Sequence, residues 1–135
     1  MLDTNVVLSG VLWQGTPFRL LEMICHQPSV QLYSSTVLLE ELADVLTRPF
    51  ATQRLALIGK TARDVLTDYI EAVELVEPVT VPRVVLNDPD DDHVIAAAVA
   101  AHADCIVSGD SDLLSLEGHQ GIPILSAAQA LRRLG

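Results

Sequence analysis

The chain has few cysteines and few aromatic residues for its length. Its two cysteines, Cys25 and Cys105, are too few for a disulfide framework, and Cys105 lies in an apolar run where a buried thiol is the ordinary interpretation. Only 4% of the residues are aromatic although 50% are hydrophobic, so we expect a core made mainly of Leu, Val, Ile and Ala. This composition is not that of a disordered chain.

Long hydrophobic runs and basic residues are also scarce. No segment approaches the roughly 20 uncharged apolar residues of a membrane span, and Asp3 puts acid where a signal peptide carries base. We therefore expect a cytoplasmic protein with no membrane partner. The net charge of -10 argues against a protein that coats nucleic acid through a basic face. It does not exclude a nucleic-acid substrate, because bound cations would reverse the local field at an acidic site.

The arrangement of apolar segments predicts an α/β fold. Short apolar runs alternate with longer segments of helical periodicity, which favours a parallel sheet flanked by helices. We find no repeat, linker or low-complexity tail, and 135 residues fit one domain. The expected helices cover about 17–26, a segment capped at 34–36, two segments within 50–76, about 91–102, one turn after 110, and a C-terminal segment capped at 126. The expected strands are 30–33, part of 76–85, 105–108 and 122–125.

Four short acidic patches each adjoin an apolar segment; they cover 2–5, 39–42, 88–92 and 108–112. Asp3 and Asp110 follow strand candidates, and open α/β sheets bind ligands beyond the carboxyl ends of their strands. Asp92 opens a helix, and Glu41 lies beside the apolar stripe of another, so both can turn toward the sheet. Carboxylates gathered at one point stay ionised together only if a cation or a donor network compensates. The pattern therefore predicts a divalent-metal site.

Several motifs occur together in a fixed order. They are Leu-Asp-Thr-Asn-Val, a Glu-Leu pair on the second predicted helix, Asp-Asp-Asp-His-Val-Ile-Ala-Ala-Ala, Ala-Asp-Cys-Ile-Val-Ser-Gly-Asp-Ser-Asp-Leu-Leu and Gly-Ile-Pro-Ile-Leu. Over nearly the whole chain, this series resembles a PIN domain. More narrowly, it is similar to bacterial and archaeal PIN proteins described as toxin components of type II toxin–antitoxin systems. The order and spacing of the motifs carry the resemblance, since no single motif is specific.

The resemblance implies a fold, an activity and a set of site residues. The fold would be a three-layer α/β/α sandwich with a central, mostly parallel sheet of about five strands, in a single PIN-like domain over residues 1–135. The activity would be metal-dependent endoribonucleolytic cleavage of single-stranded RNA with Mg²⁺ or Mn²⁺. By position, the catalytic and metal-binding acids are Asp3, Glu41, Asp92 and Asp110, with Asp112 as a further metal-binding acid. Asn5 and Ser108 match polar residues that orient the site.

The expected chemistry suits these residue types. Mg²⁺ and Mn²⁺ take hard oxygen ligands and keep several waters, which a few carboxylates around a phosphate allow. With two ions roughly 3.5 to 4 Å apart, one would activate the attacking water and the other would stabilise the leaving 3′ oxygen. The family also suggests two partners: a small antitoxin whose peptide occupies the acidic crevice, and a second copy that forms a homodimer lining an RNA groove.

Each site assignment has an ordinary structural alternative. Asp88, Asp90 and Asp91 are more simply explained as a solvated turn and helix N-terminus, where acids interact favourably with the helix dipole. Asp112 fits a helix cap about as well as a metal ligand. For Asp92 the spacing of the family motif favours the ligand.

Two other functions are compatible with the sequence. A haloacid-dehalogenase-like phosphatase also uses an Asp after its first strand and a Gly-Asp pair after a later one. That class has Asp-x-Asp at the first motif, whereas Asp3-Thr4-Asn5 supplies no second acid. A non-catalytic interaction module would keep the PIN fold and bind a partner, but the presence of all four acids argues against this alternative.

The first strand is unusually short. Only Met1 and Leu2 precede Asp3, whereas the family usually has several apolar residues there in a central strand. A two-residue central strand would leave ladder groups of its neighbours unpaired. We therefore expect that the true start lies upstream, or that the first strand is frayed or extends into residues 5–8.

Overall fold

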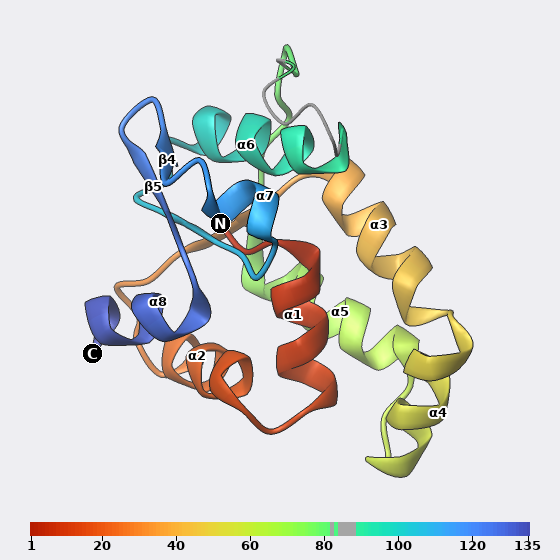
Figure 1. Ribbon diagram of the computed structural model, residues 1–135. Coiled ribbons are helices and arrows are strands. Elements are labelled where there is room, and N and C mark those ends of the chain that lie inside the picture. Colours follow the sequence, from red (N-terminus) through yellow and green to blue (C-terminus); the bar gives the residue numbers. More distant parts are fainter. Residues whose placement is uncertain (82, 84–88) are drawn as a thin grey trace.

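The computed structural model describes residues 1–81, 83 and 89–135. Its elements are shown in Figure 1 and follow in the order α1 (Thr4–Leu12), α2 (Thr16–Cys25), β1 (Leu32–Ser34), α3 (Thr36–Leu46), α4 (Pro49–Leu57), α5 (Ala62–Ala72), β2 (Val73–Leu75), α6 (Pro89–Ala101), β3 (Ile106–Val107), α7 (Ser111–Leu114), β4 (Gly118–His119), β5 (Ile122–Leu125) and α8 (Ala127–Leu134). Among these elements, no helix combines the length and apolar character that crossing a bilayer requires.

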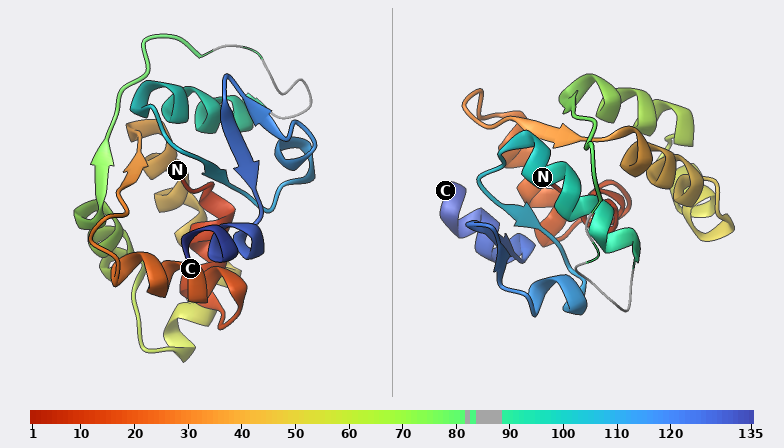
Figure 2. Two further views of the ribbon diagram at one scale, coloured as in Figure 1. Left: turned by 90° about the vertical axis from the view of Figure 1, so that its left-hand side faces the viewer. Right: turned by 90° about the horizontal axis from the view of Figure 1, so that it is seen from above.

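The strands are short and mostly parallel, as predicted. β1 pairs with β2 in parallel, β3 pairs with β5 in parallel, and β4 pairs with β5 in antiparallel orientation. On the other side of β3, Leu2 forms a parallel bridge with Val107. In Figure 2 the strands stand in a row, and the N-terminus lies between β1 and β3. The first segment of the chain thus occupies a central place in the sheet.

Apolar side chains form one core on each face of this row of strands. Ile106 and Val107 are neighbours in β3 and point to opposite faces, as successive strand residues do. Val107 belongs to an apolar cluster with residues of α1, α2, α3, α4 and α5, while Ile106 belongs to a second cluster with residues of α6, α7 and β5. Helices on both faces of the strands confirm the predicted three-layer α/β/α fold.

Capping residues fix several helix starts where the sequence predicts them. The Ser35 hydroxyl accepts a hydrogen bond from the Leu38 amide (3.3 Å), and Thr61 does the same for Asp64 (3.1 Å). Ser126 opens α8 through a reciprocal capping box with Gln129. Such caps satisfy the amides that a first helical turn leaves unpaired.

Two expectations about strands are wrong. Residues 5–8 belong to helix α1, so the first strand does not extend into them. The strand expected within 76–85 begins earlier, at Val73, directly after α5. Residues 82, 84 and 85 of that range lie outside the described residues. The hairpin strand β4 was not expected, because two residues are too few to show an alternating pattern.

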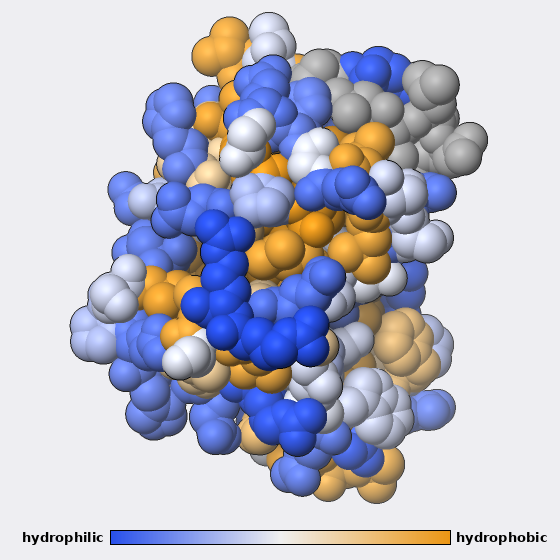
Figure 3. Space-filling view, turned by 60° about the vertical axis from the view of Figure 1, so that its left-hand side comes forward, coloured by the Kyte–Doolittle hydropathy of each residue, from blue (hydrophilic) through white to orange (hydrophobic). Residues whose placement is uncertain are grey.

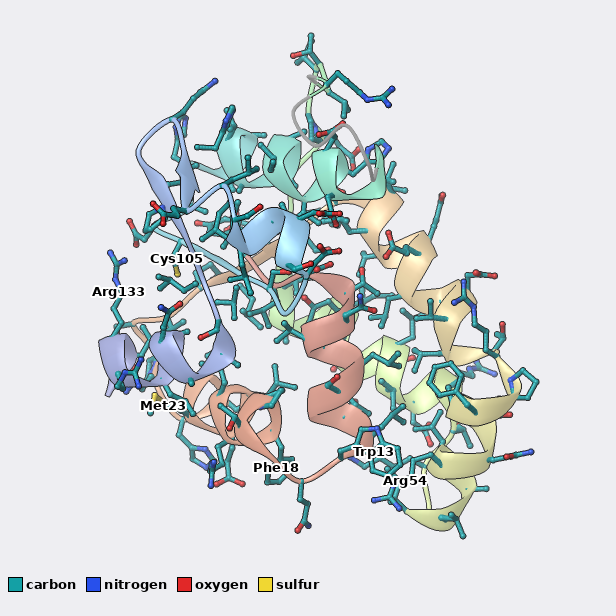
Figure 4. All side chains as sticks on the ribbon, in the orientation of Figure 1. Trp13, Phe18, Met23, Arg54, Cys105 and Arg133 are labelled. Carbon is teal, nitrogen blue, oxygen red and sulfur yellow. The ribbon has the colours of Figure 1, made fainter. Side chains whose placement is uncertain are left out.

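A cavity of about 550 Å³ adjoins the start of the chain. Residues of β1, β3 and α2 line it together with Met1, Cys105 and Arg133; the last two are labelled in Figure 4. On this side of the molecule, Figure 3 shows apolar side chains exposed between hydrophilic ones. The α-ammonium of Met1 donates to the Cys105 carbonyl (3.2 Å), and burial lowers its pKa.

Candidate metal centre

Three aspartates from two segments of the chain lie together. Carboxylate oxygens of Asp91, Asp110 and Asp112 are all within 4.8 Å of one another. We call these residues the three-aspartate group. Among the His, Cys, Asp and Glu residues that the structure describes, these are the ones that lie close enough together to share an ion. Asp91 comes from the first turn of α6 and is only 4% exposed, whereas Asp110 and Asp112 are half-buried.

The turn between β3 and α7 positions two of these acids. Asp110 is the N-cap of α7, and its Oδ1 accepts a hydrogen bond from the Asp112 amide (2.7 Å). The Asp110 amide donates to the Ser108 hydroxyl (3.0 Å). Because Ser108 is itself anchored by its amide to Leu125 of β5 (2.9 Å), the turn is tied to the sheet. The Asp110 carboxylate is therefore fixed by backbone geometry on both sides.

Asp3 is held beside the three-aspartate group by the same serine. The Ser108 hydroxyl donates to Oδ2 of Asp3 (2.8 Å), and Ser108 is 0% exposed. The Asp3 amide donates to the Val107 carbonyl (2.9 Å), which puts Asp3 level with the end of β3. One buried hydroxyl thus connects the Asp3 carboxylate to the backbone of Asp110, although the two acids are far apart in sequence.

Other predicted site residues lie outside the three-aspartate group. Glu41 is half-buried on α3, and Asp92 is 2% exposed on α6, directly after Asp91. Asn5 is exposed on α1, and within the described residues no hydrogen bond joins its side chain to a carboxylate. The roles predicted for Glu41, Asp92 and Asn5 stay predictions.

The expectation of a solvated Asp91 is wrong. The structure starts α6 at Pro89, two residues before the predicted start, so Asp91 lies inside the first turn. Proline at the first helical position is a known start signal, so Pro89 indicates the observed start. The predicted helix of about 91–102 already contains Asp91, and what the sequence does not indicate is the burial of its side chain. Asp88 lies outside the described residues, and the same holds for the side chain of Asp90.

Comparison with known families agrees with this geometry. A family model described as PIN domain matches residues 1–112, a range that includes Asp3 and the whole three-aspartate group. The chain belongs to the PIN domain family. Neither a curated protein nor a solved structure matches it. PIN domains are generally metal-dependent nucleases, and the acidic group of this PIN domain fits that chemistry.

The donor set suits a hard divalent cation. Three carboxylates within 4.8 Å of one another repel, and a cation between them would convert that repulsion into attraction. Carboxylate oxygens are the protein ligands that Mg²⁺ and Mn²⁺ prefer. A set of only three protein ligands, two of them half-buried, would leave coordination positions for water and for a substrate oxygen.

Proposed function

We propose that this PIN domain is a Mg²⁺- or Mn²⁺-dependent endoribonuclease that cleaves single-stranded RNA. The observation that supports the proposal most is the three-aspartate group, with Asp3 tied to it through Ser108. Asp91, Asp110 and Asp112 would hold the metal. When bound, the ion would supply a Lewis acid for the phosphate and a water molecule of lowered pKa.

The residues of the chain contribute fixed positions for charge. The Asp110 carboxylate accepts a hydrogen bond from the Asp112 amide, and the Asp110 amide donates one to the Ser108 hydroxyl, so the carboxylate needs little reorganisation to act as a ligand. Asp3 accepts a hydrogen bond from the same Ser108 hydroxyl. Preorganised groups of this kind avoid the entropic cost of ordering them during the reaction.

We also propose that the chain acts as the toxin of a toxin–antitoxin pair and binds both a small antitoxin and a second copy of itself. This proposal is supported by large apolar side chains at the surface. Phe50 and Leu57 of α4 are 52% and 79% exposed, and Trp13, labelled in Figure 4, packs on the Arg54 guanidinium with 4.3 Å to the ring centroid. Exposed apolar surface of this kind is common at protein–protein interfaces.

A cleavage assay on the purified chain tests the nuclease proposal. Single-stranded RNA, single-stranded DNA and p-nitrophenyl phosphate are each incubated with Mg²⁺, with Mn²⁺ and with EDTA. We expect the chain to cleave RNA, and to do so only when metal is present. Asp110→Asn should lower the rate of RNA cleavage by at least about 100-fold. Asp68→Asn, which removes an exposed acid of α5, is the matched control and should cleave as wild type does. Cleavage in EDTA, or preference for the phosphatase substrate, would contradict the proposal.

A further inference from the structure

A second cavity, of about 290 Å³, shares Asp110 and Ser108 with the candidate metal centre. Its walls come from α1, from the start of α2, from the turn between β3 and α7, and from the start of α8. Its volume is close to the lower end of the range for small-molecule sites, which begins at about 300 Å³. One ring system with its sugar would fill it, and a longer ligand would have to continue outside.

The lining of this cavity is neutral except for Asp110. No other charged side chain is among the described residues that line it, so it offers nothing to neutralise a phosphate. Val6, Pro17 and Ala127 supply apolar surface. A site with apolar walls and a few polar groups is typical for a neutral, flat ligand.

Two polar side chains of α1 can form hydrogen bonds with such a ligand. Asn5 and Ser9 are four residues apart on the helix and therefore lie on the same face. Within the described residues, neither side chain hydrogen-bonds to another protein group. The Asn5 amide offers a donor and an acceptor together, which is the pairing that reads a base edge. The Ser126 hydroxyl accepts from the Gln129 amide (3.2 Å) and keeps its proton to donate.

We propose that this cavity binds the nucleoside next to the cleaved phosphate and that Asn5 selects its base. This inference rests on the proposed ribonuclease function. The phosphate would lie at the three-aspartate group, where the metal neutralises it, and the neighbouring base would enter the neutral cavity past Asp110. The cavity would thereby give the enzyme a preference for one nucleotide beside the scissile bond.

The test compares cleavage sites in a randomised single-stranded RNA pool, read by sequencing after incubation with Mn²⁺. We expect wild type to enrich one nucleotide at a fixed position beside the cut. Asn5→Ala should reduce this enrichment by about five-fold or more, the effect of losing a paired polar contact. Ser9→Leu, which fills the cavity, should weaken binding of the RNA and also reduce the enrichment. Gln53→Ala changes an exposed amide of α4 in the same way as Asn5→Ala and should leave the enrichment unchanged.

Each outcome decides the inference. Equal enrichment in wild type and Asn5→Ala, or no enrichment in wild type, would overturn the nucleoside site while leaving the ribonuclease proposal intact. A chain that cleaves no RNA would refute the ribonuclease proposal alone. In that case, adenosine, guanosine, cytidine and uridine are each titrated into the protein in EDTA, and amide NMR shifts show whether the cavity binds a nucleoside. Base-dependent shifts at Asn5 and Ser9 that Ser9→Leu removes would support the nucleoside site, and their absence would overturn it.

Discussion

The hydroxyl of Ser108 joins two acids that the chain keeps far apart. It donates to Asp3 and accepts from the amide of Asp110, so both of its hydrogen-bonding functions are used inside the site. Alanine at this position would leave the buried Asp3 carboxylate and the partly buried Asp110 amide without this partner. Because removing a partner from buried polar groups costs about 1 to 3 kcal/mol, the residue matters for both stability and geometry.

Ser108→Ala is therefore expected to lower the melting temperature by several degrees and to weaken Mn²⁺ binding by about 10- to 100-fold, as loss of a supporting hydrogen bond does in metal sites. Calorimetric melting and Mn²⁺ titration measure the two effects. Ser29→Ala, at an exposed serine outside the site, is the control. Unchanged Mn²⁺ affinity in Ser108→Ala would show that the position of Asp3 does not affect the metal centre.

A second prediction at the scale of residues concerns which of the neighbours Asp91 and Asp92 acts as the third acid of the site. Asp91 is within 4.8 Å of the other two acids, whereas the family spacing read from the sequence favours Asp92. We expect Asp91→Asn to lower kcat for RNA cleavage by at least about 100-fold and to do so more strongly than Asp92→Asn. Steady-state kinetics on both variants measures this difference. A larger loss in Asp92→Asn would mean that the third acid is the one the sequence pattern indicates.

At the scale of elements, the turn into α7 and the first turn of α6 carry the acids that meet. The end of β3 and the turn into α7 place Asp110 where the sequence predicts, because a short apolar run followed by Ser-Gly-Asp-Ser-Asp indicates a strand, a turn and a helix cap. For α6, the start at Pro89 makes Asp91 the third residue of the helix, and Asp91 and Asp92 are both buried there, 4% and 2% exposed. Their burial depends on how the helix packs against the rest of the molecule, which a start signal in the sequence does not give.

The first segment of the chain also acts as a structural element. Met1 and Leu2 contribute a single bridge to the sheet, and the cavity beside them is lined in part by the apolar side chains of Leu32 and Val107. We expect an extension of about three apolar residues before Met1 to fill part of this cavity and raise the melting temperature by about 5 to 10 °C. Scanning calorimetry measures the change, and an extension of the same length made of serines is the control. Equal melting temperatures for the two extended chains would contradict the prediction.

The apolar extension should also change how the stability of the chain depends on pH. Burial lowers the pKa of the Met1 α-ammonium from its ordinary value of 8.0, so the unfolded state binds this proton more tightly than the folded state does. The stability of the chain that begins at Met1 should therefore rise with pH from the lowered pKa up to about 8. The apolar extension moves the amino group out of this site and should flatten that rise.

At the scale of the whole molecule, two apolar cores fix the sheet and thereby bring the acids together. The layered α/β/α fold and its parallel pairing follow from alternating apolar runs and helical segments, and the sequence predicts both. The meeting of Asp91 with Asp110 and Asp112 could not be read from the sequence with the same certainty. It depends on the apolar cluster in which Val94 and Ile95 of α6 are buried together with Leu113 of α7, and tertiary packing of this kind leaves no local signal.

The molecule as a whole carries a net charge of -10, and the site gathers three of its carboxylates, so the site needs a counter-ion to bind RNA. Calorimetric titration of Mn²⁺ into wild type, Asp91→Asn and the control Asp68→Asn tests this claim most directly. We expect saturable binding by wild type and Asp68→Asn, and affinity at least about 10-fold lower in Asp91→Asn. Equal affinity in all three proteins, or no binding by wild type, would contradict the assignment of the three-aspartate group as the metal centre.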